Sequence, residues 1–301
     1  MSSRPTSSEP RLVLIARNPT AGRGSSSTRI ADLAKCLETC SFDVMVESDL
    51  TQITRIAREV KSAGNLKAIV CAGGDGTIRL IANHLGTEFD YAVFPLGTEN
   101  LLAKHFRISG DVNSFCQMIQ AGIRQRIDAG RANDQLFLIM VSCGFDAEVV
   151  DKLHRSRVGH IRHSSYFAPV IQTIFNYRFP QLQITVDGQQ LAAARWAFVF
   201  NLPRYAMNLA LAPMARGNDG LLDLKTFHRG NFLNGLLNFF SVLLRRDQKW
   251  KLSQHTTGQT IEITSESPVA YQIDGDLGGH LPVKIEILPA YLSLFTPAPL
   301  K

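Results

Sequence analysis

A glycine-rich segment with the sequence GGDGT occupies residues 73–77, between an apolar run and a helical pattern. Glycine lets the backbone approach a ligand closely, and the amide groups at the start of a helix favour anions. Asp75 would repel a phosphate unless Mg²⁺ or water lies between them, or unless it accepts the proton of an attacking hydroxyl. The segment therefore predicts a polyphosphate site with an acidic group, and a tight turn capped by Asp75 is the alternative.

Two further loops have a similar composition. NPTAGRG covers residues 18–24 and LGTEN covers residues 96–100, and each follows an apolar run. Thr20, Thr77 and Thr98 would supply hydroxyls, and the glycines would supply amides. Neither GxxxxGK[ST] nor GxGxxG is present, so the expected nucleotide site uses neither the P-loop nor the dinucleotide fingerprint.

The first third of the chain must position these loops. Apolar strand patterns alternate there with helical patterns, which predicts βαβ units and a doubly wound, mostly parallel sheet. Binding sites in such sheets lie beyond the carboxyl ends of the strands, where all three loops are expected. The expected strands are 11–17, 42–47, 67–73 and 91–97, and the expected helices run through Ile30–Leu37, Thr51–Ala63 and Thr77–Leu85.

The pattern changes near Ile123. Short apolar segments with turn signals follow and predict antiparallel sheets, most simply a sandwich. Two strands are expected around an Asn-Asp turn at 133–134, and helices at 147–155, 163–177 and Asn231–Arg246. The other expected strands are LQITVDGQ, ARWAFVFNL, LLDLKTF, TIEITSES, VAYQIDGD, VKIEILP and YLSLF.

Length and composition limit the protein class. A chain of 301 residues favours two domains, and 45% hydrophobic residues describe a soluble globular protein. The net charge of +6 suggests an anionic partner, although a merely basic protein is the alternative. The five cysteines lack zinc spacing and indicate reduced thiols. Reduced thiols and the lack of an apolar leader predict a cytoplasmic protein. The sequence has no apolar stretch long enough to span a membrane, so any membrane contact is expected to be peripheral.

Several motifs together resemble the diacylglycerol-kinase-like lipid kinases, which include bacterial soluble diacylglycerol kinases and sphingosine kinases. They run in family order along nearly the whole chain: NPTAGRG, GGDGT, PLGTEN, RIDAG, GFDAEV, NDGLLDL and DGDLGG. The resemblance implies a phosphofructokinase- and NAD-kinase-like α/β domain over residues 11–130 with a returning strand at 290–301. It implies a β-sandwich domain for the lipid acceptor over 131–289, with residues 1–10 as a disordered tail.

The resemblance also implies ATP as phosphoryl donor, Mg²⁺, and a lipid primary hydroxyl as acceptor. The implied nucleotide contacts are Asn18, Thr20, Gly22, Gly73, Gly74, Gly76, Thr77, Thr98 and Asn100. A metal site falls on Asp219 with backbone help from Arg216 and Leu221, and Asp128 matches a carboxylate of the supporting network. The general base falls on Asp276 by one family pattern and on Asp75 by the sphingosine kinase pattern.

Two departures from the family pattern affect this site. The usual GTGND or GTTND is GTENL here, so Leu101 replaces an aspartate, and Glu99 is a candidate to restore that carboxylate. Asp276 stands where the family usually has Glu, which shortens its reach by one methylene.

The acceptor and the partners stay open from sequence. Aromatic residues and cations in Asn231–Arg246 and in residues 154–167 suit an anionic membrane surface, with an ordinary core helix and a solvated loop as the alternatives. No nucleic-acid-binding pattern appears, and a homodimer is compatible with the sequence. The alternative functions are an NAD-kinase-like small-molecule kinase and a catalytically weak nucleotide- or lipid-binding module.

Overall fold

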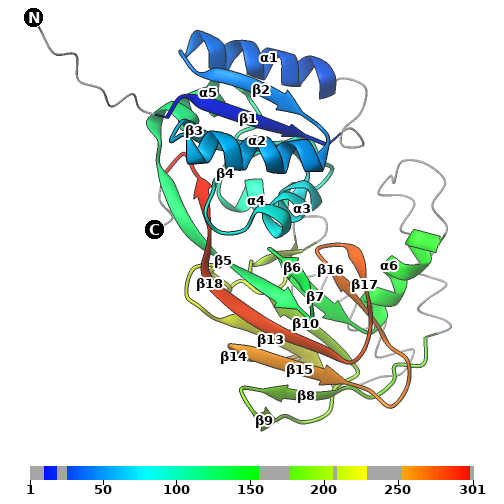
Figure 1. Ribbon diagram of the computed structural model, residues 1–301. Coiled ribbons are helices and arrows are strands. Elements are labelled where there is room, and N and C mark those ends of the chain that lie inside the picture. The colour runs from blue at the N-terminus through cyan, green and yellow to red at the C-terminus, as the bar shows by residue number, and fades with distance from the viewer. Residues whose placement is uncertain (1–9, 19–25, 156–176, 206–208, 229–252, 299–301) are drawn as a thin grey trace, which may run out of the picture. The chain divides into compact units, whose positions relative to one another are not determined.

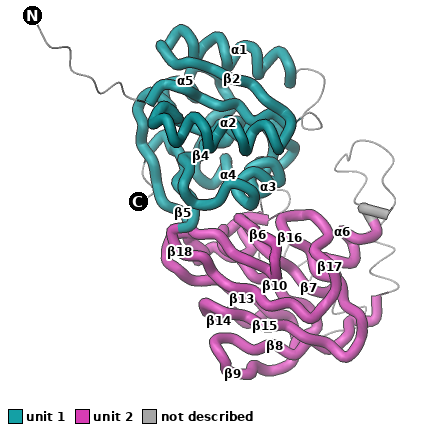
Figure 2. The backbone as a smooth tube through the Cα atoms, viewed as in Figure 1, with its two compact units in different colours: residues 1–127, 291–301 teal, residues 128–290 magenta. Residues whose placement is uncertain are grey.

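The computed structural model describes residues 10–18, 26–155, 177–205, 209–228 and 253–298. The chain divides into two compact units, residues 1–127 with 291–301 and residues 128–290 (Figure 2). Several predictions lie outside the described residues. They are the expected tail except its last residue, the expected helices at 163–177 and Asn231–Arg246, and the loop residues Thr20 and Gly22.

Unit 1 is built on a parallel sheet in the strand order β2-β1-β3-β4-β18, and each neighbouring pair is parallel. The interior residues of β1, β3 and β4 are almost completely buried, as expected for a sheet covered on both faces. The strands are β1 (Leu12–Arg17), β2 (Asp43–Glu47), β3 (Leu66–Gly73), β4 (Asp90–Pro95) and the end of β18 (Val283–Phe295).

Helices cover both faces of this sheet. One face carries α1 (Ser26–Thr39) and α5 (Val112–Ala121), and the other carries α2 (Leu50–Ser62) and α3 (Asp75–Leu85) (Figure 1). A short helix, α4 (Leu101–His105), follows β4. This architecture confirms the predicted doubly wound α/β fold.

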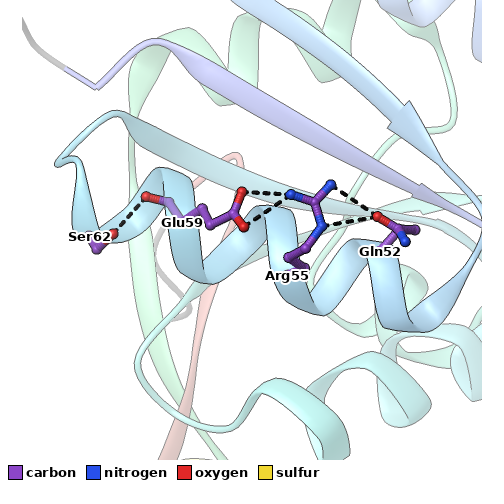
Figure 3. Close-up of polar contacts among 4 residues, drawn as sticks. All are labelled: Gln52, Arg55, Glu59 and Ser62. Carbon is purple, nitrogen blue, oxygen red and sulfur yellow. Dashed lines mark hydrogen bonds and ion pairs between the residues drawn. The ribbon is translucent and has the colours of Figure 1, made fainter.

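Local side-chain contacts stabilise α2. Asp49 caps the helix, because its Oδ1 accepts the Gln52 backbone N–H at 2.9 Å. One turn further on, the Arg55 guanidinium bonds the Gln52 side chain and pairs with Glu59 at 2.8 Å (Figure 3). The pair is exposed, so it contributes only about 0.3–0.5 kcal/mol to helix stability.

Two strands continue from one unit into the other. β5 (Arg124–Ala132) crosses the boundary between Ile127 and Asp128, and β18 crosses it between Ala290 and Tyr291. The sequence predicted two separate strands where β18 is continuous, although Ala290 has a positive φ of 48°.

Unit 2 is an antiparallel sandwich. One sheet has the order β14-β13-β10-β7-β16-β17, and the other joins β18, β15, β8 and β9, with β5 paired to β18 and β6 paired to β5. Residues of alternating position, such as Val199, Leu224, Ile263 and Ile285, fill the core between the sheets. The strands are β6 (Gln135–Phe137), β7 (Met140–Cys143), β8 (Gln183–Val186), β9 (Gln189–Gln190), β10 (Trp196–Phe200), β13 (Leu222–Phe227), β14 (Ser253–Gly258), β15 (Thr260–Thr264), β16 (Ala270–Ile273) and β17 (Asp276–His280).

Two smaller elements complete unit 2. The helix α6 (Phe145–Arg155) packs against β7, β16 and β17, and β11 (Arg204–Tyr205) pairs with β12 (Leu209–Ala210). The predicted sandwich is confirmed, and α6 begins two residues before the expected helix at 147–155.

The thiols follow the expectation from sequence. All five cysteines are unpaired, and Cys71, Cys116 and Cys143 are buried. Burial raises the pKa of each of these three thiols. Within the ranges that the structure describes, no helix has the length and hydrophobicity to span a bilayer.

Candidate nucleotide and phosphoryl-transfer site

The ends of three strands that precede the predicted loops lie side by side at the carboxyl edge of the unit 1 sheet. β3 lies between β1 and β4, and Asn18 is the residue of the first loop that the structure describes. The Asn18 side-chain amide donates to the Thr77 hydroxyl at 3.1 Å, which joins the end of β1 to the first turn of α3. The Leu96 N–H donates to the Gly73 carbonyl at 2.9 Å, which joins the ends of β3 and β4.

The glycines at this edge allow a very close approach of the backbone. A Cβ atom on Gly97 would lie 2.6 Å from the Gly74 Cα, so no larger residue fits there without movement. A Cβ atom on Gly73 would lie 2.1 Å from the Thr77 hydroxyl. The loops after β3 and β4 therefore touch through their main chains, a contact that glycine permits because it has no side chain.

The start of α3 has the features of an anion site. Gly74 is the N-cap, and in the part of the chain that the structure describes no side chain caps this helix. The first amides of a helix without a side-chain cap suit phosphate oxygens. Gly76 is exposed in this first turn, whereas Thr77 is buried.

The loop after β4 is fixed by Asn100. This residue has a left-handed φ of 49°, and its side chain accepts from the Gly97 N–H at 2.9 Å and donates to the Gly97 carbonyl at 2.7 Å. Thr98 is exposed at the tip of the loop, and Glu99 lies 3.8 Å from the Lys104 ammonium. Asn100 thus closes the loop, which presents the Thr98 hydroxyl to solvent.

Asp75 holds the start of α4. Its Oδ2 accepts the Leu101 N–H at 2.9 Å and its Oδ1 accepts the Leu102 N–H at 3.0 Å. The Leu101 side chain is buried, at 8% exposure. The position where the family pattern has an aspartate therefore contributes a backbone amide to Asp75 and an apolar side chain to the core.

In unit 2, Asp128 organises the turn that contains Asp219. The Asp128 side chain is buried, and its oxygens accept the Gly220 N–H at 2.8 Å and the Ala290 N–H at 2.7 Å. Its backbone carbonyl accepts from Asn201 at 3.0 Å. One carboxylate thus ties β5 to the 217–220 turn and to β18.

Asp219 is exposed on that turn. Its Oδ1 accepts the Leu221 N–H at 3.2 Å, and Arg216 is also exposed. Among the described residues, no three His, Cys, Asp or Glu side chains are grouped closely enough to hold a metal ion. Mg²⁺ needs only one or two carboxylates when waters complete its shell, so this turn suits a hydrated ion at most.

Asp276 begins β17 just after a two-residue hairpin turn. Asp274 and Gly275 both have positive φ, 50° and 91°, as a type I′ turn requires, and Ile273 pairs with Asp276. The Asp274 carboxylate accepts the N–H groups of three residues at 2.9–3.0 Å: Leu138, Ile139 and Met140. Asp276 therefore stands on a turn anchored to β7, with its side chain partly buried.

A polar network in unit 2 was not predicted from sequence, although GFDAEV and DGDLGG were both noted. Asp146 accepts from Ser142 at 2.5 Å, from Gln272 at 3.3 Å, and from the Tyr205 hydroxyl. Desolvation raises the pKa of Asp146, and these three hydrogen bonds oppose that rise. The missed signal is a polar residue at alternate positions of otherwise apolar strands, as at Ser142 and Gln272.

The described candidate residues thus form one group in unit 1 and two separate sets in unit 2. Unit 1 brings together Asn18, Asp75, Asn100 and the glycines and threonine of the GGDGT segment. Unit 2 joins Asp128 to the turn of Asp219 and carries Asp276 on a separate hairpin.

Comparison with known proteins assigns a family to each part of the chain. The diacylglycerol kinase catalytic domain matches residues 11–132, and the YegS C-terminal NAD kinase beta sandwich-like domain matches residues 139–296. A diacylglycerol kinase of Mycobacterium tuberculosis is 26% identical over 292 residues, covering 93% of both chains. One from Staphylococcus saprophyticus is 22% identical over 296 residues, covering 95% of this chain and 96% of the relative.

A solved structure shows the same fold. A diacylglycerol kinase from Bacillus anthracis superposes with a TM-score of 0.72 at 23% identity, covering 95% of this chain and 97% of the other.

The α/β unit and the antiparallel sandwich correspond to the two domains of a kinase. The chain belongs to the diacylglycerol kinase family, with the catalytic-domain model on residues 11–132 and the YegS C-terminal model on residues 139–296.

Proposed function

We propose that the protein is an ATP-dependent lipid kinase that transfers the γ-phosphoryl group to a primary hydroxyl of a lipid such as diacylglycerol. The main support is the contact of the two glycine-bearing loops after β3 and β4, together with Asn18 at the end of β1, at one sheet edge. The names of the relatives support the acceptor, because both curated relatives described above are called diacylglycerol kinases.

The unit 1 loops would hold the triphosphate of ATP. The amides at the start of α3, from Gly74 through Gly76, would bind phosphate oxygens, and Thr98 and Asn18 would add polar side chains. The close packing of Gly74 on Gly97 supports this role, because it brings the backbones of the loops after β3 and β4 together, where both could contact one ligand. Phosphoryl transfer depends on such positioning more than on covalent chemistry by the protein.

Asp276 is our candidate for the general base. The two oxygens of Asp75 accept the amides of Leu101 and Leu102, which supports a scaffolding role for Asp75. Asp276 sits on an anchored hairpin and would accept the proton of the lipid hydroxyl as its oxygen bonds to the γ-phosphorus and the bond to ADP breaks.

Asp219, with backbone groups near Arg216 and Leu221, would hold Mg²⁺. The bound ion would offset the charge that develops on the transferring phosphoryl group. Asp128 would keep the turn in place through its bond to Gly220.

The family that matches residues 139–296 is described as NAD kinase beta sandwich-like. A second candidate acceptor is therefore the ribose hydroxyl of NAD. A radiolabelled-ATP assay against a panel of diacylglycerol, a sphingoid base and NAD separates the possibilities. The proposal expects labelled lipid phosphate; labelled NADP alone would favour the second acceptor, and no transfer would favour a weak binding module.

A further inference from the structure

The Asp146 network leads from α6 to the turn that carries Asp276. We use this name for the side chains of Ser142, Asp146, Tyr205 and Gln272. Ser142 and Gln272 are completely buried and lie opposite each other on the neighbouring strands β7 and β16. The Gln272 side-chain N–H donates to the Ser142 hydroxyl at 3.0 Å and to Asp146 at 3.3 Å.

The other end of the Gln272 amide reaches the hairpin turn. Its Oε1 accepts the backbone N–H of Gly275 at 2.7 Å. Gly275 immediately precedes Asp276, the candidate base. The carboxylate of Asp274 also anchors this turn, through the amides of Leu138, Ile139 and Met140 at the start of β7.

Asp146 determines which way the Gln272 amide points. An ionised carboxylate can only accept hydrogen bonds, so it favours the orientation that directs the Gln272 NH₂ group toward it. The Ser142 hydroxyl donates to Asp146 at 2.5 Å and is therefore left to accept from Gln272. If the amide were reversed, its NH₂ group would face the N–H of Gly275, and the turn would lose an acceptor.

We propose that Asp146 and Gln272 are positioning residues, which act through Gly275 to set the place of Asp276. This inference rests on the proposed function only for the role of Asp276. The hydrogen bond between Gln272 and Gly275 can be tested whether or not the protein phosphorylates a lipid.

Asparagine and glutamate variants test the polarity of the network. Asp146→Asn leaves one acceptor oxygen, so its NH₂ group meets either the Gln272 NH₂ group or the Tyr205 hydroxyl, both of which donate to Asp146 in the wild type. Gln272→Glu places a second carboxylate beside Asp146. Each single variant should lower kcat for lipid phosphorylation about 10- to 100-fold, because small misplacements of a reacting group have effects of this size. The KM for ATP should stay within about twofold, since all four residues of the network belong to unit 2 and the proposed ATP loops to unit 1.

The double variant Asp146→Asn with Gln272→Glu exchanges donor and acceptor across the pair. The NH₂ group introduced on α6 could then donate to the carboxylate introduced on β16, whose second oxygen could accept from Gly275. Recovery of kcat to within about threefold of wild type is expected, because interaction energies of paired residues are non-additive.

Hydrogen exchange of the Gly275 amide provides a readout that needs no activity. Gln272→Met removes the acceptor while keeping the side-chain volume similar, so Gly275 should exchange roughly five- to tenfold faster. The matched control is Asp187→Ala, which removes a carboxylate that accepts the Gln259 and Thr260 amides at another sandwich turn. It should lower stability without changing kcat or Gly275 exchange.

Unchanged Gly275 exchange in Gln272→Met would overturn the proposal. A double variant as slow as the singles, or a kcat loss in Asp187→Ala equal to theirs, would also overturn it. If the wild-type protein phosphorylates no lipid, the proposed function fails, while the exchange experiment still decides whether Gln272 holds the turn.

Discussion

Asp128 Oδ2 lies 2.8 Å from the backbone nitrogen of Gly220, so a buried carboxylate holds the residue that follows Asp219. Asp128→Ala should lower the free energy of unfolding by about 2–3 kcal/mol, because two partly buried backbone amides lose a buried carboxylate acceptor. Urea denaturation measures this loss. Asp219→Ala, on the exposed part of the same turn, should change stability by less than about 0.5 kcal/mol and reduce turnover instead. Equal stability losses in both variants would contradict the separate roles.

Asp276 should be needed for catalysis and dispensable for folding. Asp276→Asn should lower kcat by about 10²- to 10⁴-fold, the usual contribution of a general base. Asp276→Glu is the matched control: it keeps a carboxylate that can accept the proton and should retain far more activity than Asp276→Asn. Steady-state kinetics with thermal melts as a folding check measure both. Full activity of Asp276→Asn would remove Asp276 from the mechanism.

Gly97 should control nucleotide binding through its contact with Gly74. Gly97→Ala forces the two loops apart, because the new Cβ would lie 2.6 Å from the Gly74 Cα. It should lower kcat/KM for ATP about 10- to 100-fold. Gly64→Ala serves as the control, because Gly64 has φ of 70° with no atom within 4 Å of a new Cβ. It should cost about 1–2 kcal/mol of stability from backbone strain and leave the KM for ATP unchanged.

Asp75 should stabilise the loop after β4. Asp75→Ala removes the acceptor of the Leu101 and Leu102 amides and should lower the free energy of unfolding by about 0.5–2 kcal/mol, as the loss of a helix cap does. Asp75→Asn keeps one acceptor and should lie between the wild type and Asp75→Ala. If Asp75→Asn abolished turnover with no loss of stability, Asp75 would be a better candidate for the base than Asp276.

The Asp146 carboxyl should make stability depend on pH. Its pKa is raised above the ordinary 3.8 by desolvation, so the folded protein binds this proton more tightly than the unfolded chain. The free energy of unfolding should therefore fall as pH rises from about 4 through the folded-state pKa, and then level off. Comparing the wild type with Asp146→Asn by urea denaturation from pH 4 to 8 isolates this effect, because the variant lacks the titrating group. A difference that grows with pH in favour of the wild type would contradict it.

The sequence predicted most of the strands because their apolar runs are long and lie at buried positions, as in β1 and β3. It missed β14 and β17, which read SQHTTG and DLGGH and have no apolar alternation. It also missed α5, although Asp111 as N-cap and Gly122 as C-cap mark both ends of that helix. Partners across the sheet, which no local pattern reveals, decide the secondary structure of strands such as β14 and β17.

Within the site, sequence spacing identified which loops would meet but not how their side chains bond. The amide acceptor role of Asp75 depends on α4, a five-residue helix that the sequence did not predict. The bonds of Asp128 to Gly220 and Ala290 span 92 and 162 residues, so they follow only from the folded chain. The same holds for the link from Asp146 to Gln272.

The most direct test of the central claim measures transfer of the labelled γ-phosphate of ATP to diacylglycerol in mixed micelles, with wild-type protein and Asp276→Asn assayed together. The account predicts that the wild type makes labelled lipid phosphate in a Mg²⁺-dependent reaction and that Asp276→Asn makes at least about 100-fold less. Equal product from both proteins, or no labelled lipid from the wild type, would contradict it.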